Sequence, residues 1–378
     1  MKPIVAHYNS SFLPLSETFI YEYVTKLEKY QAIVLAKVRE NPDCFPFKDL
    51  YLLSDRPQFP RWRFWPEFIG RILKRSFATA FFEQVMKGSQ ARLIHAHFGP
   101  RGVEMLPLKR RLCLPLVTTF YGQDLSVYPR HKYWRKAYQK LFMEGTLFLV
   151  EGSFMKKGLI ALGCPPEKIR IQHMAVDIYK FTYQERTPER DEKVRILFCG
   201  RFVEKKGLLG ALQAVKIAAE NIGNLEFRII GDGELRPKVE NYIQGNEMNR
   251  YVVLLGYQSH EQYRQELLKA HILLQPSITA SDGDSEGGAP TVLLEAQATG
   301  LPVVSTIHAD IPEVVLDGIT GFLVPQRDPK ALAVKIQDLI RHPRLHVELG
   351  KAGRRHIEEN YNIYTEIKKL EVIYDGLL

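Results

Sequence analysis

Apolar residues recur along the chain in short runs rich in Val, Ile and Leu, and most of these runs are separated by stretches with the apolar spacing of helices. Strands are expected at the runs, because a strand buried on both faces loses the alternation of apolar and polar residues. In the first half they lie at residues 3–8, 32–36, 92–98, 114–120 and 146–152. In the second half they lie at residues 194–200, 225–231, 251–256, 271–277, 301–306 and 320–325.

Strands that alternate with helices predict an α/β fold with parallel sheets covered on both faces. A chain of 378 residues is longer than a single core usually supports, so two domains are expected. The apolar pattern gives way to polar and charged residues between residues 173 and 194, which predicts a boundary near residue 180. We therefore expect two Rossmann-like domains, at residues 1–180 and 181–360, followed by a helix at residues 361–378.

The composition is that of an ordinary globular protein, with 45% hydrophobic and 25% charged residues. The first residues, MKPIVAHYNSSF, are too short and polar a stretch for a signal peptide, and no apolar run reaches the length of a membrane-spanning helix. These features predict a cytoplasmic protein. The cysteines are far apart in the sequence, so we expect neither disulfides nor a zinc site from Cys44, Cys113, Cys164 and Cys199.

The charge is spread unevenly. Residues 1–180 carry a net charge of +13, whereas residues 181–378 carry −4. Most of the excess lies between residues 51 and 150, which hold 17 basic and 6 acidic residues. A basic half predicts an anionic partner, for which nucleic acid and a membrane surface are both candidates at this point.

Ligands of open α/β sheets bind outside the carboxyl ends of the strands, so the residues after each strand are the candidates for a binding site. The run VRILFC is followed by GRFVEKKGLLGAL, in which Gly200 allows a tight turn and a helix is expected to begin near Lys206. Arg201 and Lys206 beside a helix N-terminus are typical of a phosphate or diphosphate site. The alternative is a solvated charge pair in a loop.

A second loop, GDGEL, follows FRII, and its glycines Gly231 and Gly233 permit close approach of the backbone to a ligand. Many turns use glycine only for geometry, so this signal is weak by itself.

The third loop carries the strongest pattern. After HILLQPS comes DGDSEGGAP, in which Pro290 is expected to pre-set the first turn of a helix. Free backbone N–H groups there can bind phosphate oxygens. Glu286 at the mouth can accept hydrogen bonds from sugar hydroxyls, and Glu295 inside the helix can reach a ribose diol. The pattern predicts a nucleotide diphosphate sugar held by Gly287, Gly288, Ala289, Pro290 and Thr291 between the two glutamates.

Taken together, GRFVEKKG, IIGDGEL, PSITASDGDSEGGAPTVLLEAQATGLPVVST and IPEVVLDGITGFLVP resemble the retaining nucleotide-sugar glycosyltransferases of family 4. The first half matches more weakly, through LSETFIYEYV, LIHAHFG, FYGQD and FMKKGLIALGCPPEKI. The resemblance is closest to bacterial exopolysaccharide enzymes of the colanic acid type. It implies the glycosyltransferase B fold, with two Rossmann-like domains facing a cleft, and a C-terminal helix at 361–378 that crosses back to the first domain.

The resemblance also implies roles for the residues already singled out. Arg201 and Lys206 would hold the diphosphate, Glu286 the donor sugar and Glu295 the ribose, which makes Glu286, Arg201 and Lys206 the expected catalytic residues. No metal or other cofactor is implied, because the two cations and the helix N-terminus would offset the charge of the leaving nucleotide.

Two departures from the family pattern limit this transfer. Glu286 and Glu295 enclose eight residues where the family usually has seven, so Gly287 or Gly288 looks inserted, unless Asp284 or Ser285 takes the role of Glu286. In addition, FYGQD places Tyr121 where the family commonly carries histidine.

The first half is expected to bind the acceptor. Ser16 is a good helix N-cap, and with Glu17 and Thr18 it is also a candidate acceptor contact. His95 and His97 are expected to point to opposite faces of a strand, which argues against a shared metal. The acceptor-binding residues predicted are Ser16, Glu17, Thr18, His97, Tyr121 and Asp124.

The predicted function is transfer of a sugar from a nucleotide donor to a glycan or lipid-linked acceptor in bacterial surface polysaccharide synthesis. The alternative is a non-catalytic nucleotide-sugar-binding protein of the same fold. Nucleic acid is not an expected partner, because no recognition motif is present. An anionic membrane surface is a further expected partner. The stretch 61–88 has the spacing of an amphipathic helix, whose apolar face is expected to pack on the sheet. Its basic side is either solvated or bound to anionic lipid at the inner face of the plasma membrane.

Overall fold

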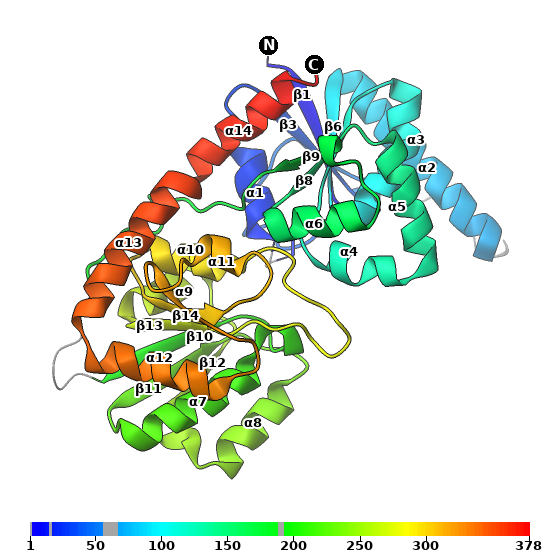
Figure 1. Ribbon diagram of the computed structural model, residues 1–378. Helices are drawn as coiled ribbons and strands as arrows, with labels where there is room; N and C mark the ends of the chain where they lie inside the picture. The colour runs from blue at the N-terminus through cyan, green and yellow to red at the C-terminus, as the bar shows by residue number, and fades with distance from the viewer. Residues whose placement is uncertain (1, 15–16, 56–66, 188–192) are drawn as a thin grey trace. The chain divides into compact units, whose positions relative to one another are not determined.

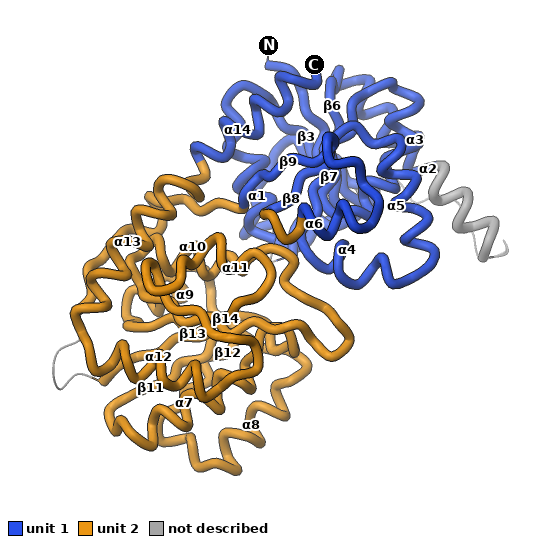
Figure 2. Tube along the Cα trace, in the orientation of Figure 1, with its two compact units in different colours: residues 1–151, 156–173, 364–378 blue, residues 152–155, 174–363 orange. Residues whose placement is uncertain are grey.

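A computed structural model describes residues 2–14, 17–55, 67–187 and 193–378. It divides into two compact units (Figure 2). Unit 1 consists of residues 1–151, 156–173 and 364–378, and unit 2 of residues 152–155 and 174–363.

Unit 1 is built on a parallel sheet with the strand order β5-β3-β1-β6-β7-β8-β9 (Figure 1). Its strands are β1 (Ile4–Tyr8), β3 (Gln31–Ala36), β5 (Leu50–Leu52), β6 (Ala91–His97), β7 (Leu116–Thr119), β8 (Leu147–Val150) and β9 (Ile169–Ile171). A short separate pair consists of β2 (Ser11–Phe12) and β4 (Val38–Arg39). The helices that lie wholly or mainly in this unit are α1 (Thr18–Thr25), α2 (Glu67–Ser89), α3 (Gly99–Leu112), α4 (Gln123–Ser126), α5 (Lys132–Glu144), α6 (Ser153–Ala161) and α14 (Ile363–Asp375).

Helices cover both faces of this sheet because neighbouring strand residues point to opposite sides. Tyr8 packs on Phe82 of α2, with their ring centroids 5.5 Å apart. The preceding residue, His7, packs on His95, which in turn contacts Tyr374 of α14. The helices α2 and α14 therefore lie on opposite faces of the sheet.

Unit 2 has a parallel sheet with the strand order β12-β11-β10-β13-β14-β15. Its strands are β10 (Val194–Cys199), β11 (Leu225–Ile230), β12 (Val252–Gly256), β13 (Ile272–Gln275), β14 (Val303–Thr306) and β15 (Gly321–Val324). Its helices are α7 (Leu208–Asn221), α8 (Arg236–Gly245), α9 (His260–Lys269), α10 (Thr291–Ala298), α11 (Ile311–Val314), α12 (Pro329–Arg341) and α13 (Arg344–Asn360).

Two apolar cores sandwich the sheet of unit 2. Ile196 and Phe198 of β10 belong to the core formed with α7, α8 and α12, whereas Leu197 between them belongs to the core formed with α9 and α10. Both faces of β10 are thus buried, which is why this strand reads as a continuous apolar run.

Every strand expected from the apolar runs is present. The sequence pattern missed β5 and β9, which are only three residues long and lie at the two edges of the unit 1 sheet, and the separate two-residue strands β2 and β4. Within the described residues, no helix has both the length and the apolar character required to cross a membrane.

Candidate functional site

The strand order of unit 2 reverses direction between β10 and β13, which are neighbours in the sheet. The loops that follow these two strands run to opposite sides, so their starting points frame a crevice of the kind that binds ligands in open α/β sheets. The Gly200 to Gly207 loop leaves β10, and the acidic, glycine-rich loop at residues 276–290 leaves β13. These are the first and third loops singled out from the sequence.

Glycines hold the loops of the site close together. A Cβ atom on Gly231, at the end of β11, would lie 2.0 Å from the carbonyl oxygen of Gly200, and Gly231 has a φ of 127°. Gly207 has a φ of 69°, and a Cβ atom there would lie 1.9 Å from the Pro276 oxygen. Only glycine fits at either position. Gly231 thus shapes the site through backbone packing.

Lys206 is the last residue of a short 3₁₀ turn, Glu204–Lys206, and the helix expected near Lys206 begins at Leu208. Its ammonium Nζ donates a hydrogen bond to Oε2 of Glu286 at 2.8 Å, and the two side chains are only 15% and 7% exposed. Arg201 has an exposed side chain. Within the part of the chain that the structure describes, its guanidinium has no hydrogen bond or ion pair.

Glu286 is held by three hydrogen bonds, two to its carboxylate and one from its backbone N–H. Besides the bond from Lys206, its Oε1 accepts a hydrogen bond from the Ser277 hydroxyl at 2.7 Å, and its backbone N–H donates to Nε2 of His308 at 3.2 Å. Burial favours the protonated carboxyl, but the charges of Lys206 and Lys205 and the two hydrogen bonds outweigh it and keep the pKa of Glu286 below its usual value. Glu286 is therefore ionised and accepts hydrogen bonds only.

Lys205, which the sequence analysis did not single out, is the more buried of the two lysines. Its Nζ lies 3.0 Å from a carboxylate oxygen of Asp284 and donates to the Ser285 carbonyl at 3.1 Å. Asp284 and Ser285, the alternatives to Glu286, are thus both engaged with Lys205, and Glu286 alone of the three bonds Lys206. Gly287, one of the two candidates for the extra residue, has a φ of 79°, a conformation that favours glycine.

Backbone donors line the start of α10. Among the described residues, no acceptor is found for the N–H groups of Gly287, Gly288, Ala289 and Thr291. Pro290, expected in the first helical turn, lies one position before it. Pro290 is the N-cap, with φ −57° and an extended ψ of 131°, and α10 begins at Thr291. A set of free N–H groups at a helix N-terminus is suited to binding an anion.

Glu295 lies in α10 and accepts a short hydrogen bond from the hydroxyl of Tyr263 in α9. Burial raises the pKa of Glu295 to about 7, although the bond from Tyr263 works in the opposite direction. Burial, with the nearby charge of Glu295, also raises the pKa of Cys199 to about 12, so this thiol stays protonated. Neither Tyr263 nor Cys199 was predicted, because they reach Glu295 from separate elements.

The acceptor residues predicted in unit 1 lie at several strand ends. Ser16 lies outside the described residues, and the N-cap position of α1 is occupied by Glu17 instead of the expected Ser16. Glu17 does not cap the helix; its Oε2 accepts a hydrogen bond from the Asn9 side chain at 2.8 Å. Burial raises the pKa of Glu17 to about 7. Thr18 is the first residue of α1.

Asp124 braces the loops after β6 and β7. Its carboxylate accepts hydrogen bonds from the backbone N–H groups of Gly99, Tyr121 and Gly122, at 2.8, 3.0 and 2.9 Å. The residue is only 2% exposed, so its oxygens are used within the protein. Asp124 shapes this edge of unit 1 by fixing the position of Tyr121.

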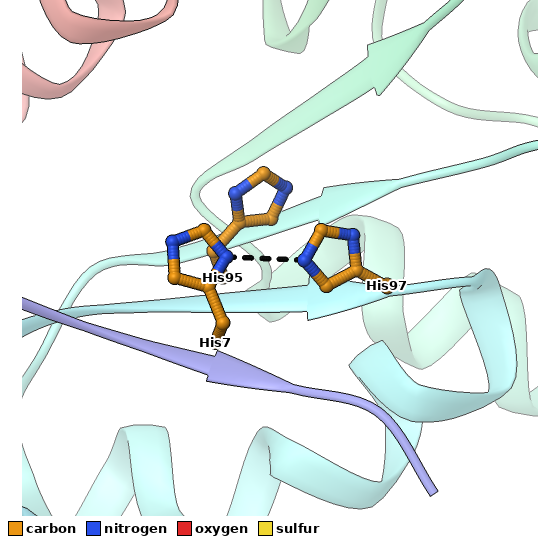
Figure 3. Close-up of side chains that lie close together, drawn as sticks. All are labelled: His7, His95 and His97. Atoms are coloured by element: carbon orange, nitrogen blue, oxygen red, sulfur yellow. Dashed lines mark hydrogen bonds between the residues drawn. The ribbon is translucent and has the colours of Figure 1, made fainter. Parts of the chain in front are cut away.

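The prediction that His95 and His97 point to opposite faces of a strand was wrong. Side chains alternate with a period of two, so positions i and i+2 share a face, and the two imidazole centroids lie 4.6 Å apart. His7 joins them from β1, where the strand register pairs it with His95 (Figure 3). Burial lowers the pKa of His7 to about 3 and the pKa values of His95 and His97 well below their usual range. All three imidazoles are neutral at pH 7.

The three histidines offer nitrogen atoms within 4.8 Å of one another, which is the one arrangement of metal-ligand type among the described residues. Among the described residues, every ring nitrogen of the three histidines except Nε2 of His7 is engaged in a hydrogen bond. His7 Nδ1 and His97 Nε2 are 3.1 Å apart, and His95 is bonded to Tyr374 at 2.6 Å and to Thr119 at 2.7 Å. Nitrogen ligands on tetrahedral zinc lie about 3.3 Å apart, and the near-parallel rings of His95 and His97 do not converge on one point. The expectation of no metal remains a prediction.

Comparison with known proteins identifies the family. Residues 180–356 match the family described as "Glycosyl transferases group 1", and residues 16–180 match "Glycosyltransferase Family 4". The chain is 35% identical over 292 residues to the amylovoran biosynthesis glycosyltransferase AmsK of Erwinia amylovora, covering 76% of this chain and 70% of that protein. It is 33% identical over 315 residues to the putative colanic acid biosynthesis glycosyltransferase WcaL of Escherichia coli K12, covering 82% and 76%.

Solved structures show the same fold. The crystal structure of Anabaena Alr3699/HepE in complex with UDP aligns over the whole of both chains with a TM-score of 0.79, at 16% identity. The apo form of the lipopolysaccharide outer core galactosyltransferase WaaB aligns with a TM-score of 0.73 and 18% identity, again over all of both chains. The predicted fold class is therefore confirmed, and the chain belongs to the family 4 glycosyltransferases, enzymes of the glycosyltransferase B fold.

Proposed function

We propose that this glycosyltransferase binds a nucleotide diphosphate sugar at the carboxyl edge of the unit 2 sheet. The observation that carries the proposal is the buried Lys206–Glu286 ion pair beside the free N–H groups at the start of α10. Lys206 and the exposed Arg201 bind the diphosphate, and the N–H groups from Gly287 to Thr291 bind its oxygens. These fixed charges offset the negative charge that develops on the leaving nucleotide, so no metal is required.

The two glutamates take different parts of the donor. Glu286 is ionised and adjoins the phosphate-binding groups, so it accepts hydrogen bonds from the donor sugar. Glu295 lies further along α10, and its carboxyl accepts hydrogen bonds from the ribose hydroxyls. The reaction retains the anomeric configuration, as the family resemblance implies. Unit 1 binds the acceptor through the edge that carries Glu17, Thr18 and Tyr121.

The relatives favour an acceptor in exopolysaccharide synthesis, because AmsK and WcaL are named for amylovoran and colanic acid. A growing glycan or lipid-linked sugar is the corresponding acceptor. Work on a lipid-linked acceptor also requires contact with a membrane. The sequence predicts this membrane contact at residues 61–88. Residues 61–66 and the side chains at 67–76 lie outside the described part of the structure, so the contact at this stretch stays a prediction.

Helix α5 provides a described surface of the required kind. Tyr133 and Met143 are 64% and 72% exposed, and they share one face of the helix with the exposed side chains of Lys132, Lys136 and Lys140. Exposed apolar groups among basic residues fit an anionic lipid surface, where each lysine contributes about 1 kcal/mol. We expect sedimentation with phosphatidylglycerol vesicles that weakens in salt and in a Lys136→Glu/Lys140→Glu variant, whereas Lys238→Glu in unit 2 leaves it unchanged. Equal binding to neutral vesicles would contradict this surface.

The donor proposal is tested by thermal unfolding in the presence of UDP-, GDP- and dTDP-linked sugars. A ligand at 100 times its dissociation constant adds about 2.7 kcal/mol to the free energy of unfolding. We expect stabilisation by one nucleotide class, and its loss in Arg201→Ala. The same donor, incubated with enzyme and membrane extract, should release free nucleotide. Stabilisation without release would favour the alternative, a binding protein of the same fold, and no stabilisation by any donor would contradict the site.

A further inference from the structure

The hydroxyl of Tyr121 points into the protein. It is hydrogen-bonded to Nδ1 of the buried His97 at 2.7 Å. Burial is the largest cause that raises the pKa of this hydroxyl well above its usual value, although the residue as a whole is only half-buried. The hydroxyl is thus the buried end of the side chain, and the exposure of Tyr121 comes from the rest of the residue.

The hydrogen bond between His7 and His97 (Figure 3) fixes the direction of the bond between His97 and Tyr121. Among the described residues, Nε2 of His7 is buried with no partner. A buried unpaired N–H is rarer and costlier than an unpaired lone pair, so His7 carries its proton on Nδ1 and donates it to Nε2 of His97. His97 then carries its own proton on Nδ1 and donates it to the Tyr121 oxygen. The Tyr121 hydroxyl is held from inside the sheet.

The ring of Tyr121 belongs to a half-buried aromatic cluster. Its centroid lies 4.8 Å from that of Phe19 in α1 and 4.8 Å from that of Phe98, which follows β6. Both partners are also half-buried. The cluster lies at the carboxyl edge of the sheet, where the strand order reverses between β1 and β6. This is the position at which an open parallel sheet binds its ligand.

A polar group accompanies the cluster. Glu17 precedes Phe19 by two residues and accepts a hydrogen bond from Asn9, and its carboxyl is not fully exposed. Aromatic faces with a few oriented polar groups are typical of sites for small ligands. A pyranose ring has the matching chemistry, with an apolar face of C–H groups and hydroxyls around its rim.

We propose that Phe19, Phe98 and Tyr121 form the platform for the acceptor sugar, which stacks its C–H face on these rings while Glu17 accepts a hydrogen bond from a ring hydroxyl. Where the family commonly has a histidine, this chain has Tyr121, whose hydroxyl is bonded to His97 inside the protein and whose ring is proposed to contact the sugar. The inference rests on the proposed function of unit 1 as the acceptor-binding half.

Saturation-transfer NMR with methyl β-D-glucopyranoside and methyl β-D-galactopyranoside tests the platform without knowledge of the natural acceptor. We expect transfer to the ring C–H protons in the wild type. Tyr121→Phe should keep the signal, because only the hydroxyl is lost. Tyr121→Leu, Tyr121→His and Phe19→Leu should lower the affinity about tenfold, which corresponds to the loss of one aromatic contact.

Two outcomes would overturn the proposal. The first is an equal loss of glycoside affinity in Tyr121→Phe and Tyr121→Leu, which would show that the hydroxyl makes the contact. The second is the absence of saturation transfer to either glycoside in the wild type. Thermal unfolding of each variant with the nucleotide sugar that stabilises the wild type serves as the control. Donor stabilisation should be unchanged in all of them, because the donor residues are in unit 2. If the proposed donor site is wrong, no nucleotide sugar will stabilise the wild type, but the glycoside signals will remain. If the aromatic platform is wrong, the glycoside signals will be absent or will not depend on the rings. The two proposals can therefore fail separately.

Discussion

Replacing Lys206 by methionine removes one charge of the buried ion pair and keeps a side chain of similar length. The partner, Glu286, then remains ionised in a site where it is only 7% exposed. Breaking a buried pair costs about 3 to 5 kcal/mol when the remaining charge is wholly uncompensated. Here Ser277 still donates to Glu286 and the charge of Lys205 still acts on it. We therefore expect a loss of about 2 to 3 kcal/mol in the free energy of unfolding.

The effect on catalysis should be larger than the effect on folding. A preorganised charge that faces the leaving group is typically worth a factor of about 100 to 1,000 in turnover. Urea unfolding measures the first quantity and nucleotide release at saturating donor measures the second. The double variant Lys206→Met/Glu286→Gln should recover stability, because no unpaired charge is left, but it should not recover turnover.

The matched control is Lys238→Met on the exposed surface of α8, which should change stability by less than about 0.5 kcal/mol and leave turnover unchanged. If Lys206→Met behaves like this control in both assays, the reasoning from the ion pair is wrong. A double variant that is no more stable than Lys206→Met alone would show that the charge of Glu286 is not what destabilises the single variant.

Further expectations concern the same loops and the histidine cluster. Arg201→Ala should lower turnover without changing the unfolding midpoint, because the side chain is exposed; a large loss of stability would contradict this assignment. Glu286→Gln should lower turnover and Asp284→Asn should not, whereas the reverse result would move the donor-sugar contact to Asp284. Glu295 has a pKa of about 7, above its value in the unfolded chain, so its contribution to the free energy of unfolding should be lost as pH rises from about 4.5 to 7; the difference in this free energy between the wild type and Glu295→Gln should shrink over that range. His7 has a pKa of about 3, below its unfolded value, so unit 1 should lose stability as pH falls from about 6.5, less steeply in His7→Asn.

The fold could be predicted because the long buried strands are continuous apolar runs and most of these runs are followed by a helix. The glycine and acidic loops of unit 2 could be found for the same reason, since strand ends mark the edge at which ligands bind. The choice between the neighbouring lysines could not be made from spacing. Only the 3₁₀ turn directs Lys206 to Glu286 and Lys205 to Asp284.

Contacts between side chains of separate helices and strands could not be predicted from the sequence either. Tyr263 reaches Glu295 from another helix, and His308 reaches Glu286 from beyond the next strand. The shared face of His95 and His97, in contrast, follows from the period of a strand and was available from the sequence. What the sequence did not contain is the register that places His7 beside His95.

The departure at Tyr121 changes the side chain without disturbing the loop that carries it. Asp124 bonds the backbone N–H groups of Gly99, Tyr121 and Gly122, so the loop keeps its shape whatever side chain stands at position 121. A phenolic hydroxyl at that position needs a partner once it is buried, and His97 supplies one at 2.7 Å. Since the hydroxyl is satisfied within the protein, the substitution alters what unit 1 offers to a ligand and leaves the fold of this edge intact. The same reasoning explains why a histidine at position 121 would not restore the family arrangement by itself: its side chain is shorter than that of tyrosine, and replacing the hydroxyl removes the partner of His97 Nδ1.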